Sequence, residues 1–211
     1  MAGKPRQDPR QNTRRSILDA ARDMFVRKGY EATTMRAIAA RVDISPTAIY
    51  HHFRNKDALL TELASVDFRA LAEAFLRIGR VPDPLERLRR IGEAYVEFAN
   101  ENPMQYQLLF MTPRPKGVGQ PTGIARGDPS EDAYAFLRQT CAEAIATGQL
   151  LPEVTDPDAM AQMLWGVNHG IVSLQIVKQH DDWIAWRDVR TTARAARAAM
   201  VRGLRRQPPA G

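Results

Sequence analysis

Residues 45–60, SPTAIYHHFRNKDALL, bring together side chains of several chemical kinds. The adjacent histidines His51 and His52 raise the question of metal binding or catalysis. Adjacent positions on a helix point about 100° apart, whereas helical metal ligands are spaced three or four positions apart. No cysteine or acidic cluster accompanies the pair. We therefore expect no bound metal, no cofactor and no catalytic residue here.

The same segment has the features of a short helix that enters the major groove of DNA. Ser45 is a good N-cap residue and Pro46 suits the first helical turn, which predicts a helix over 46–52. On its exposed face Thr47 can hydrogen-bond to a base edge, and carbon atoms of Pro46 and Ala48 can contact a thymine methyl group. His51 belongs to this face, and DNA contact is its best interpretation.

A second short helix precedes it and completes a helix-turn-helix motif. This helix is predicted over 35–42, and the residues Asp43 and Ile44 link it to the next one. Apolar side chains are expected to pack the two helices together, namely Ile38, Val42, Ile44 and Ile49. The second helix of such a motif is then free to lie in a groove.

Polar and basic residues around the motif are suited to phosphate contacts, which fix the register of a protein on the duplex. Thr34 is the expected N-cap of the helix over 35–42, where free N–H groups favour an anion, and Arg36 follows it. At the far end the candidates are Tyr50, His52, Arg54 and Lys56.

The distribution of charge also favours a polyanionic partner for the N-terminal part. Residues 1–60 carry twelve Lys and Arg against six Asp and Glu, whereas residues 61–211 carry eighteen of each. The charge distribution alone does not distinguish a surface that binds a polyanion from a basic surface that only faces solvent.

The fold class predicted for the whole chain is all-α, with about nine helices, because the alternation and turns typical of strands are missing. We expect a flexible basic arm at 1–12, a helix-turn-helix DNA-binding domain at 13–60, and a helical effector-binding and dimerisation domain at 61–211. Apolar spacing and capping residues predict helices at 13–28, 35–42, 46–52, 56–78, 84–100, 104–111, 130–147, 156–179 and 183–206.

Length and composition are those of a globular protein with a sizeable core. No apolar run approaches the roughly 18 residues of a membrane span, and the N-terminal segment lacks the apolar region of a secretory signal. The single cysteine, Cys141, cannot form an internal disulfide and is most simply a small apolar helix residue. We therefore expect a reduced, cytoplasmic setting and no membrane partner.

Residues 13–60 resemble the DNA-binding domain of the TetR/AcrR family of transcriptional regulators. The resemblance rests on ILDAARDMF, KGYEATTMRAIA and ISPTAIYHHFRNKDALL, in this order and spacing. The family commonly has glycine in the turn, where this sequence has Asp43. Aspartate tolerates the left-handed backbone conformation better than most residues, so we expect the turn to form.

The resemblance implies a role for each matching position. It places four residues in the major groove: Pro46, Thr47, Tyr50 and His51. Ser45, which caps their helix, is counted with the DNA-contact residues. It places four more at phosphates: Thr34, Arg36, His52 and Lys56.

One helix-turn-helix offers little surface, so a homodimer that reads two half-sites is expected. Family members pair their last two helices, which implies an interface within residues 80–211. Small residues that allow close packing support this interpretation: Gly166, Gly170, Ala193, Ala196 and Ala199, with Met200 beside them. Packing within one subunit is the alternative. The arginines of the last helix are interpreted as a solvated face, namely Arg194, Arg197, Arg202, Arg205 and Arg206.

The C-terminal part resembles the branch of the family with a Trp-x-x-x-His-Gly signature, here Trp165, His169 and Gly170. The family holds a small molecule between its two regions, and an apolar or amphipathic effector is expected. Candidate lining residues are Met104, Tyr106, Phe110, Met111, Met163, Trp165 and His169. Ordinary core packing is the alternative for each of them.

Together these expectations describe a ligand-responsive regulator, most simply a repressor, that binds a palindromic operator in double-stranded DNA and is released by its effector. One alternative is a non-specific DNA-binding helical protein, which would bind any duplex equally. The other is an α-helical enzyme, but no local motif pairs a nucleophile with a base.

Overall fold

The computed structural model describes residues 9–113, 115–118 and 121–206. Within these ranges the chain is helical and has no strand, and an isolated bridge joins Leu150 to Arg205. The prediction of an all-α fold is therefore confirmed. No described helix is long and apolar enough to cross a membrane.

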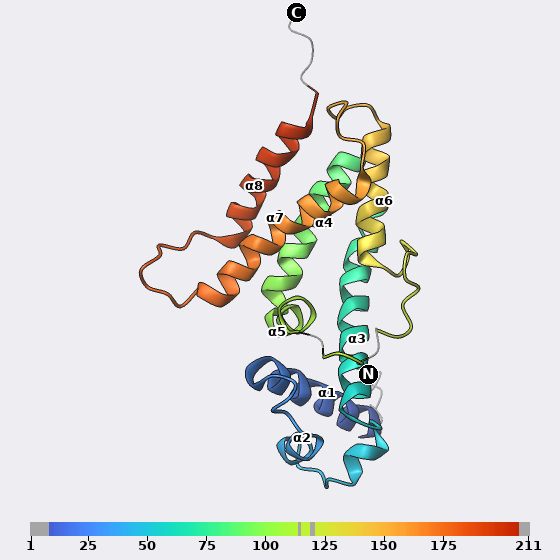
Figure 1. Ribbon diagram of the computed structural model, residues 1–211, viewed down its shortest axis with the longest axis vertical. Coiled ribbons are helices and arrows are strands. Elements are labelled where there is room, and N and C mark those ends of the chain that lie inside the picture. The colour runs from blue at the N-terminus through green and yellow to red at the C-terminus, as the bar shows by residue number, and fades with distance from the viewer. Residues whose placement is uncertain (1–8, 114, 119–120, 207–211) are drawn as a thin grey trace, which may run out of the picture. The chain divides into compact units, whose positions relative to one another are not determined.

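The first of two compact units comprises Met1–Asp67 and Met104–Gly123. Its elements, coloured blue to cyan and yellow-green in Figure 1, are α1 (Pro9–Lys28), α2 (Met35–Arg41), the 3-10 helix η1 (Ala48–His51), the first part of α3 (Lys56–Leu76), most of α5 (Pro103–Tyr106) and the π-helical turn η2 (Gln107–Met111).

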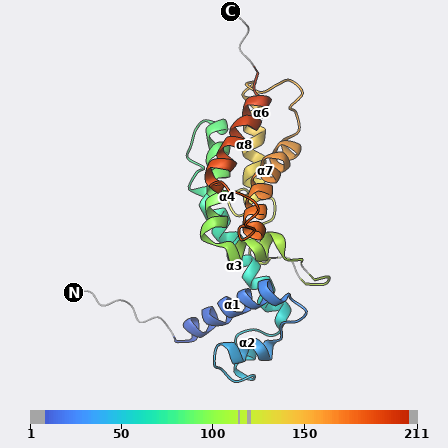
Figure 2. The ribbon, with the colours of Figure 1, turned by 90° about the vertical axis from the view of Figure 1, so that its left-hand side faces the viewer.

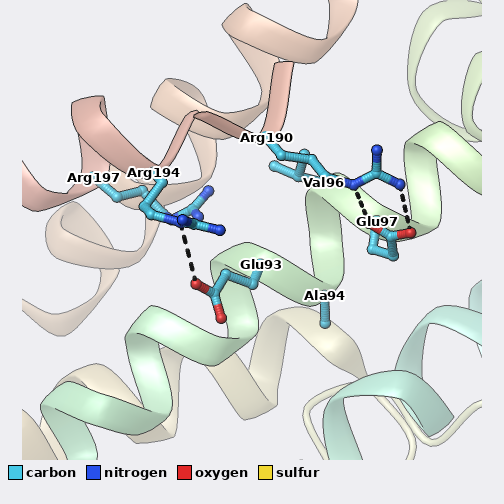
Figure 3. Close-up of a pocket in the computed structure, with 7 residues that line it drawn as sticks. All are labelled: Glu93, Ala94, Val96, Glu97, Arg190, Arg194 and Arg197. Carbon is cyan, nitrogen blue, oxygen red and sulfur yellow. Dashed lines mark hydrogen bonds and ion pairs between the residues drawn. The ribbon is translucent and has the colours of Figure 1, made fainter. Parts of the chain in front are cut away.

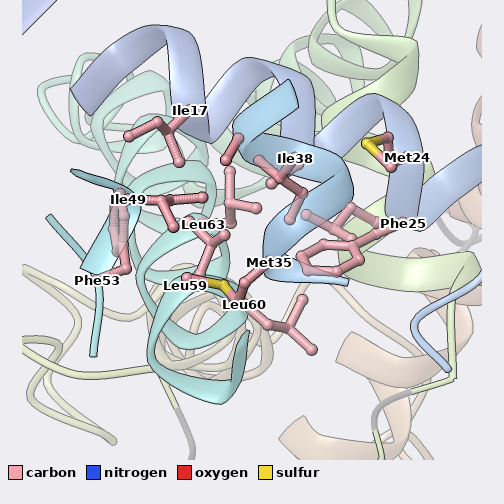
Figure 4. Packing of buried hydrophobic residues seen from close by; sticks show 13 residues of the cluster. Ile17, Met24, Phe25, Met35, Ile38, Ile49, Phe53, Leu59, Leu60 and Leu63 are labelled. Carbon is pink, nitrogen blue, oxygen red and sulfur yellow. The ribbon is translucent and has the colours of Figure 1, made fainter. Parts of the chain in front are cut away.

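One apolar core organises this unit (Figure 4). It takes residues from every helix of the unit that precedes Asp67, and Leu108 from η2 joins them. The predicted contacts of Ile38 and Ile49 are present, and Val42 and Ile44 pack against the same core. The buried members are Ile17, Ala21, Met24, Phe25, Met35, Ile38, Ala39, Ile49, Phe53, Leu59, Leu60, Leu63 and Leu108.

The second unit, Phe68–Pro103 with Ile124–Gly211, is a helical bundle. Besides the end of α3 it contains α4 (Pro84–Glu101), α6 (Ala133–Ala146), α7 (Pro157–Lys178) and α8 (Val189–Leu204). The α4 helix contacts α6, α7 and α8, and α7 contacts α6 and α8, as Figures 1 and 2 illustrate. An aspartate side chain accepts a backbone N–H bond at the start of each of these four helices.

Several helix limits differ from the predicted ones. The arm predicted at 1–12 falls partly outside the described residues, but 9–12 are helical, because Pro9 suits a first helical turn. At the other end α8 begins at Val189 instead of residue 183, since Asp188 caps it there by accepting from Thr191 N–H (2.8 Å).

The arginines of α8 are not all solvated, and this part of the prediction is wrong. Arg197 is only 4% exposed, because α8 packs against α4 and α7 at this position. The small residue Ala193 is also fully buried within the single chain. One face of α8 therefore belongs to the interior of the bundle.

A buried ion pair joins α1 to α3 in the first unit. Arg22 donates from Nη2 to Asp67 Oδ1 (2.8 Å) and from Nε to Asp67 Oδ2 (3.2 Å), and both residues are buried. Burial raises the pKa of the Asp67 carboxyl, and the Arg22 guanidinium opposes that shift. Removing Asp67 would leave Arg22 with Asp19, an exposed residue that lies 2.9 Å from Arg22 Nη1, and without its buried counter-ion.

We predict that Asp67→Asn lowers the free energy of unfolding by about 3 kcal/mol, because Arg22 loses its buried counter-ion. Urea unfolding followed by circular dichroism measures this change. Asp23→Asn is the matched control, because it removes a partner of the more exposed Arg27–Asp23 pair of α1 and should cost less than about 1 kcal/mol. Equal losses in the two variants would contradict the assigned role of the buried pair.

Candidate nucleic-acid interface

The turn between α2 and η1 contains a residue in the left-handed backbone region. Asp43 has a φ of +54°, a conformation that aspartate adopts more readily than most side chains. The turn is closed by the Ile44 N–H, which donates to the Ala39 carbonyl (3.1 Å). The expectation that aspartate supports this turn is confirmed.

The predicted helix over 46–52 is a shorter 3-10 helix, η1. Its N–H groups donate to carbonyls three residues back: Ala48 to Ser45 (3.0 Å), Tyr50 to Thr47 (3.2 Å) and His52 to Ile49 (3.0 Å). Directly beyond η1 the Phe53 N–H donates to the Ile49 carbonyl (3.0 Å), and the Phe53 side chain is buried in the core.

The predicted caps of this motif are confirmed by side-chain bonds. Ser45 Oγ accepts from the Ala48 N–H (3.1 Å), and Thr34 Oγ1 accepts from the Ala37 N–H at the start of α2 (3.1 Å). The Thr34 cap satisfies a backbone donor that α2 leaves unpaired, and Ser45 Oγ shares the Ala48 N–H with the Ser45 carbonyl. The loop between α2 and α3 is therefore fixed by its own side chains as well as by the core.

Burial of Ile49 determines which side chains of η1 face solvent. A 3-10 helix has three residues per turn, so the two positions after a buried residue point away from the core. Ile49 is fully buried, whereas Tyr50 is 55% exposed and Thr47 and His51 are also exposed. The structure thus presents polar and aromatic groups on a short, anchored element.

The nine residues assigned to DNA contact from the family resemblance and the cap at Ser45 all lie in the first unit, and α2 contacts η1 there. Seven of them are exposed: Thr34, Arg36, Ser45, Pro46, Thr47, Tyr50 and His51. The remaining two, His52 and Lys56, are half-buried. Their contact with DNA stays a prediction.

Arg14 of α1 supports the end of η1, a role that the sequence did not reveal. Its guanidinium lies over the Phe53 ring, 4.3 Å from the centroid, and donates from Nη1 to the His52 carbonyl (3.4 Å). Its Nη2 forms an ion pair with Glu62 of α3 (2.5 Å). Arg14 therefore ties the end of η1 to α1 and α3.

Lys56, at the start of α3, is held by Tyr30. Its Nζ donates to the Tyr30 carbonyl (2.7 Å) and lies 4.0 Å from the centroid of the Tyr30 ring. The Tyr30 hydroxyl in turn donates to Asp57, and burial with this carboxylate raises the pKa of the phenol. The position of the Lys56 ammonium is thus fixed from the loop after α1.

The predicted effector residues fall in different units. Met104, Tyr106, Phe110 and Met111 belong to the first unit, where Tyr106 is fully buried and packs against the Phe110 ring (5.1 Å between centroids). Met163, Trp165 and His169 lie on α7 in the second unit, where Met163 is 48% exposed.

Trp165 and His169 share a hydrogen-bonded partner, Tyr95 of α4. Trp165 Nε1 donates to the Tyr95 hydroxyl (2.9 Å), which lies 3.2 Å from His169 Nδ1. A neutral imidazole can accept the Tyr95 proton at Nδ1, whereas a protonated one cannot. Burial lowers the pKa of His169, which favours the same neutral state. Sequence reasoning missed Tyr95, because only the fold brings it to α7.

One face of α7 is apolar and exposed. Leu174 and Val177 are 56% and 59% exposed, and a Cβ atom built on Gly166 or Gly170 would meet no atom within 4 Å. With Met163, these residues follow one another at steps of three or four, so they share one side of the helix. We call this set, Met163, Gly166, Gly170, Leu174 and Val177, the α7 stripe.

Two family models match the chain. The model of bacterial regulatory proteins of the tetR family matches residues 17–63, and that of the tetracyclin repressor-like C-terminal domain matches residues 88–200. The second match alone spans more than half of the chain. The chain belongs to the TetR family of bacterial regulators. Its relatives are DNA-binding transcription regulators and not enzymes.

Individual relatives agree with this assignment. UidR of Escherichia coli K12, an HTH-type transcriptional regulator, is 27% identical over 168 residues, which cover 77% of this chain and 81% of UidR. The HTH-type transcriptional repressor Rv1474c of Mycobacterium tuberculosis is 43% identical over 68 residues, which cover 32% of this chain and 36% of that protein.

Solved structures share the fold. NalD of Pseudomonas aeruginosa has a TM-score of 0.70 at 21% identity, with 96% of this chain and all of NalD covered. PfmR of Thermus thermophilus, a TetR family regulator, has a TM-score of 0.67 at 23% identity, with 95% of this chain and all of PfmR covered. At these identities the likeness concerns the fold alone.

The hydrogen bond at His169 predicts a loss of stability in mild acid. Because its pKa in the folded state lies below the ordinary 6.5, the unfolded chain takes up the proton first as the pH falls. The midpoint of thermal unfolding should therefore drop more steeply between pH 7 and pH 5 in the wild type than in His169→Gln. His180→Gln, at an exposed histidine, should behave like the wild type. Parallel curves for all three proteins would contradict this prediction.

Proposed function

We propose that this protein is a ligand-responsive transcriptional repressor that binds a palindromic operator as a homodimer. The observation that carries the proposal is the exposed surface of η1, anchored by Ile49, in a chain whose relatives regulate transcription. The similarity of the N-terminal segment to a repressor, Rv1474c, supports repression as the mode of action.

In the proposed complex η1 lies in the major groove. Thr47 and His51 supply hydrogen-bonding groups for base edges, and Tyr50 and Pro46 supply contact surface. Phosphates are contacted by Thr34 at the start of α2, and by Arg36, His52 and Lys56. The fixed position of the Lys56 ammonium, and the cap at Thr34, support these roles.

The α7 stripe is the proposed centre of the dimer interface. Exposed leucine, valine and methionine side chains at helical spacing lose apolar surface to water when two copies pair. The open space at Gly166 and Gly170 allows a second helix to approach closely. A two-fold dimer then presents two copies of η1 to two half-sites of a palindrome.

The proposed effector is a small apolar or amphipathic molecule. Trp165, His169 and Gly170 support placement in the Trp-x-x-x-His-Gly branch, and the pair Trp165 and His169 offers polar groups beside aromatic surface. Met104, Tyr106, Phe110, Met111 and Met163 remain the other proposed lining residues. The proposed dimer has two states that differ in the spacing of its two η1 helices. The effector binds more tightly to the state whose spacing does not match the two half-sites, and so the operator is released. The α3 helix belongs to both units, because the chain divides between Asp67 and Phe68 within it. We propose that it transmits the change from the effector site to η1.

Non-specific DNA binding is the competing function, and selection of DNA fragments separates the two. The full chain is mixed with random duplexes, and the bound fragments are sequenced and footprinted. We expect an inverted repeat that is bound about a thousandfold more tightly than random duplex at the same salt concentration. Equal affinity for every duplex would contradict the proposal and favour the alternative.

Tyr50→Ala should weaken binding to the selected duplex at least tenfold, since Tyr50 is exposed on η1 and leaves the core intact. Electrophoretic mobility shifts measure the affinity, and thermal unfolding checks that the fold is retained. Trp183→Ala, which removes an even more exposed aromatic residue of the second unit, should leave the affinity unchanged. Unaltered binding by Tyr50→Ala would rule out the assigned role of η1.

Leu174→Lys should convert the dimer to a monomer, because it places a charge in the α7 stripe, where a desolvated ammonium is unfavourable. Light scattering coupled to gel filtration gives the mass directly. The exposed position Ala146, at the end of α6, provides the control Ala146→Lys, which should stay dimeric. A wild type of single-chain mass, or a dimeric Leu174→Lys, would speak against this interface.

A further inference from the structure

A cavity of about 300 Å³ lies between α4 and α8 in the second unit. Figure 3 shows three arginines of α8 facing two glutamates of α4 across it. Its lining residues are Glu93, Ala94, Val96, Glu97, Arg190, Arg194 and Arg197, and none of them is among the proposed effector residues. The cavity is therefore a separate feature of the bundle.

Two of the three arginines have carboxylate partners in the cavity. Arg190 forms a bidentate pair with Glu97, at 2.7 Å from Nε to Oε2 and 2.8 Å from Nη2 to Oε1. Arg194 lies 3.9 Å from Glu93, which also pairs with Arg89 outside the cavity (2.5 Å). Both glutamates are thus engaged by other guanidinium groups.

Arg197 is buried without a carboxylate partner among the described residues. It is 4% exposed, and its Nη1 donates to the Asn168 side-chain oxygen (2.6 Å) and to the Gly92 carbonyl (3.3 Å), both of which are neutral. Its Nε is buried and has no hydrogen-bond partner. A buried guanidinium normally has both a counter-charge and partners for its N–H groups.

The bundle is shaped to admit this arginine. A Cβ atom on Gly92 would lie 2.4 Å from Arg197 Cδ and 2.9 Å from Arg197 Nε, so the glycine creates the space that the side chain occupies. Asn168 of α7 and Gly92 of α4 orient the guanidinium from two helices. Burial lowers the pKa of Arg197 from its ordinary value, and the nearby Glu93 carboxylate, which Arg194 and Arg89 share, opposes this shift without cancelling it.

We propose that this cavity binds a small monocarboxylate, with the carboxylate at Arg197 and the carbon chain between α4 and α8. Three arginines and two glutamates leave one positive charge unmatched, so a monoanion neutralises the cavity whereas a phosphate dianion adds repulsion from Glu93 and Glu97. A guanidinium matches the two oxygens of a carboxylate. The volume is at the lower end of ligand sites, which favours a short chain.

Calorimetric titration of the full chain with butyrate, without DNA, tests this proposal independently of operator binding. Butyrate should bind at least tenfold more tightly than butyramide, its neutral analogue, and than inorganic phosphate, with chloride supplying equal ionic strength throughout. Butyrate should also raise the midpoint of thermal unfolding, and butyramide should not. Equal affinity for butyrate and butyramide would overturn the proposal.

Arg197→Met keeps the length of the side chain and removes its charge, so it should lose butyrate binding. The matched control is Arg202→Met, an exposed arginine of the same helix outside the cavity, which should bind like the wild type. Retained butyrate affinity in a folded Arg197→Met would also overturn the proposal. If Arg197→Met does not fold, the wild-type comparison of butyrate with butyramide decides. If an Asp or Glu side chain of a second protein copy already pairs with Arg197, the wild type should not bind butyrate. Absence of butyrate binding by the wild type therefore counts against the proposal.

Discussion

Burial of Ile49 in the core of the first unit is the constraint on which the candidate interface depends. The η1 helix is only four residues long and has no helical stability of its own. Ile49 and Phe53 attach it to α1, α2 and α3, and the left-handed Asp43 sets the direction in which it leaves α2. Because these anchors point inward, Tyr50, Thr47 and His51 face solvent on a rigid support.

The interior of the second unit contains large side chains that carry hydrogen-bonding groups. Tyr95, Asn168 and Arg197 bring hydrogen-bonding groups to the packed faces of α4, α7 and α8. Polar groups in such positions need partners, and Tyr95 finds them in Trp165 and His169. Arg197 finds only neutral ones among the described residues. This difference between Tyr95 and Arg197 favours an anion as the missing partner of Arg197.

Local features were predictable from the sequence. The helices α1, α2 and α3, the caps Thr34 and Ser45 and the turn at Asp43 depend on neighbouring residues, and all of them are present in the structure. The exposed candidates of η1 were predictable for the same reason.

Long-range pairings were not predictable. Arg14 reaches His52 and Arg22 reaches Asp67 across 38 and 45 positions, so only the packed fold identifies these partners. Arg197 belongs to a series of arginines along α8 whose sequence pattern predicts a solvent-exposed face. It is nevertheless buried, because Gly92, more than a hundred positions earlier, leaves room for its side chain. The 3-10 form of η1 was missed because the residues that favour a helix start, Ser45 and Pro46, do not distinguish a short 3-10 helix from an α-helix.

Affinity cleavage tests the central claim most directly. An iron chelate is attached at position 47 through Thr47→Cys, while the native Cys141 is buried and has a raised pKa that protects it from labelling. On the selected duplex we predict two symmetric clusters of strand cleavage, one in the major groove of each half-site. The same chelate at Ala146→Cys should leave the duplex intact. Uniform cleavage from position 47, or none on a duplex that is demonstrably bound, would contradict the placement of η1 in the groove.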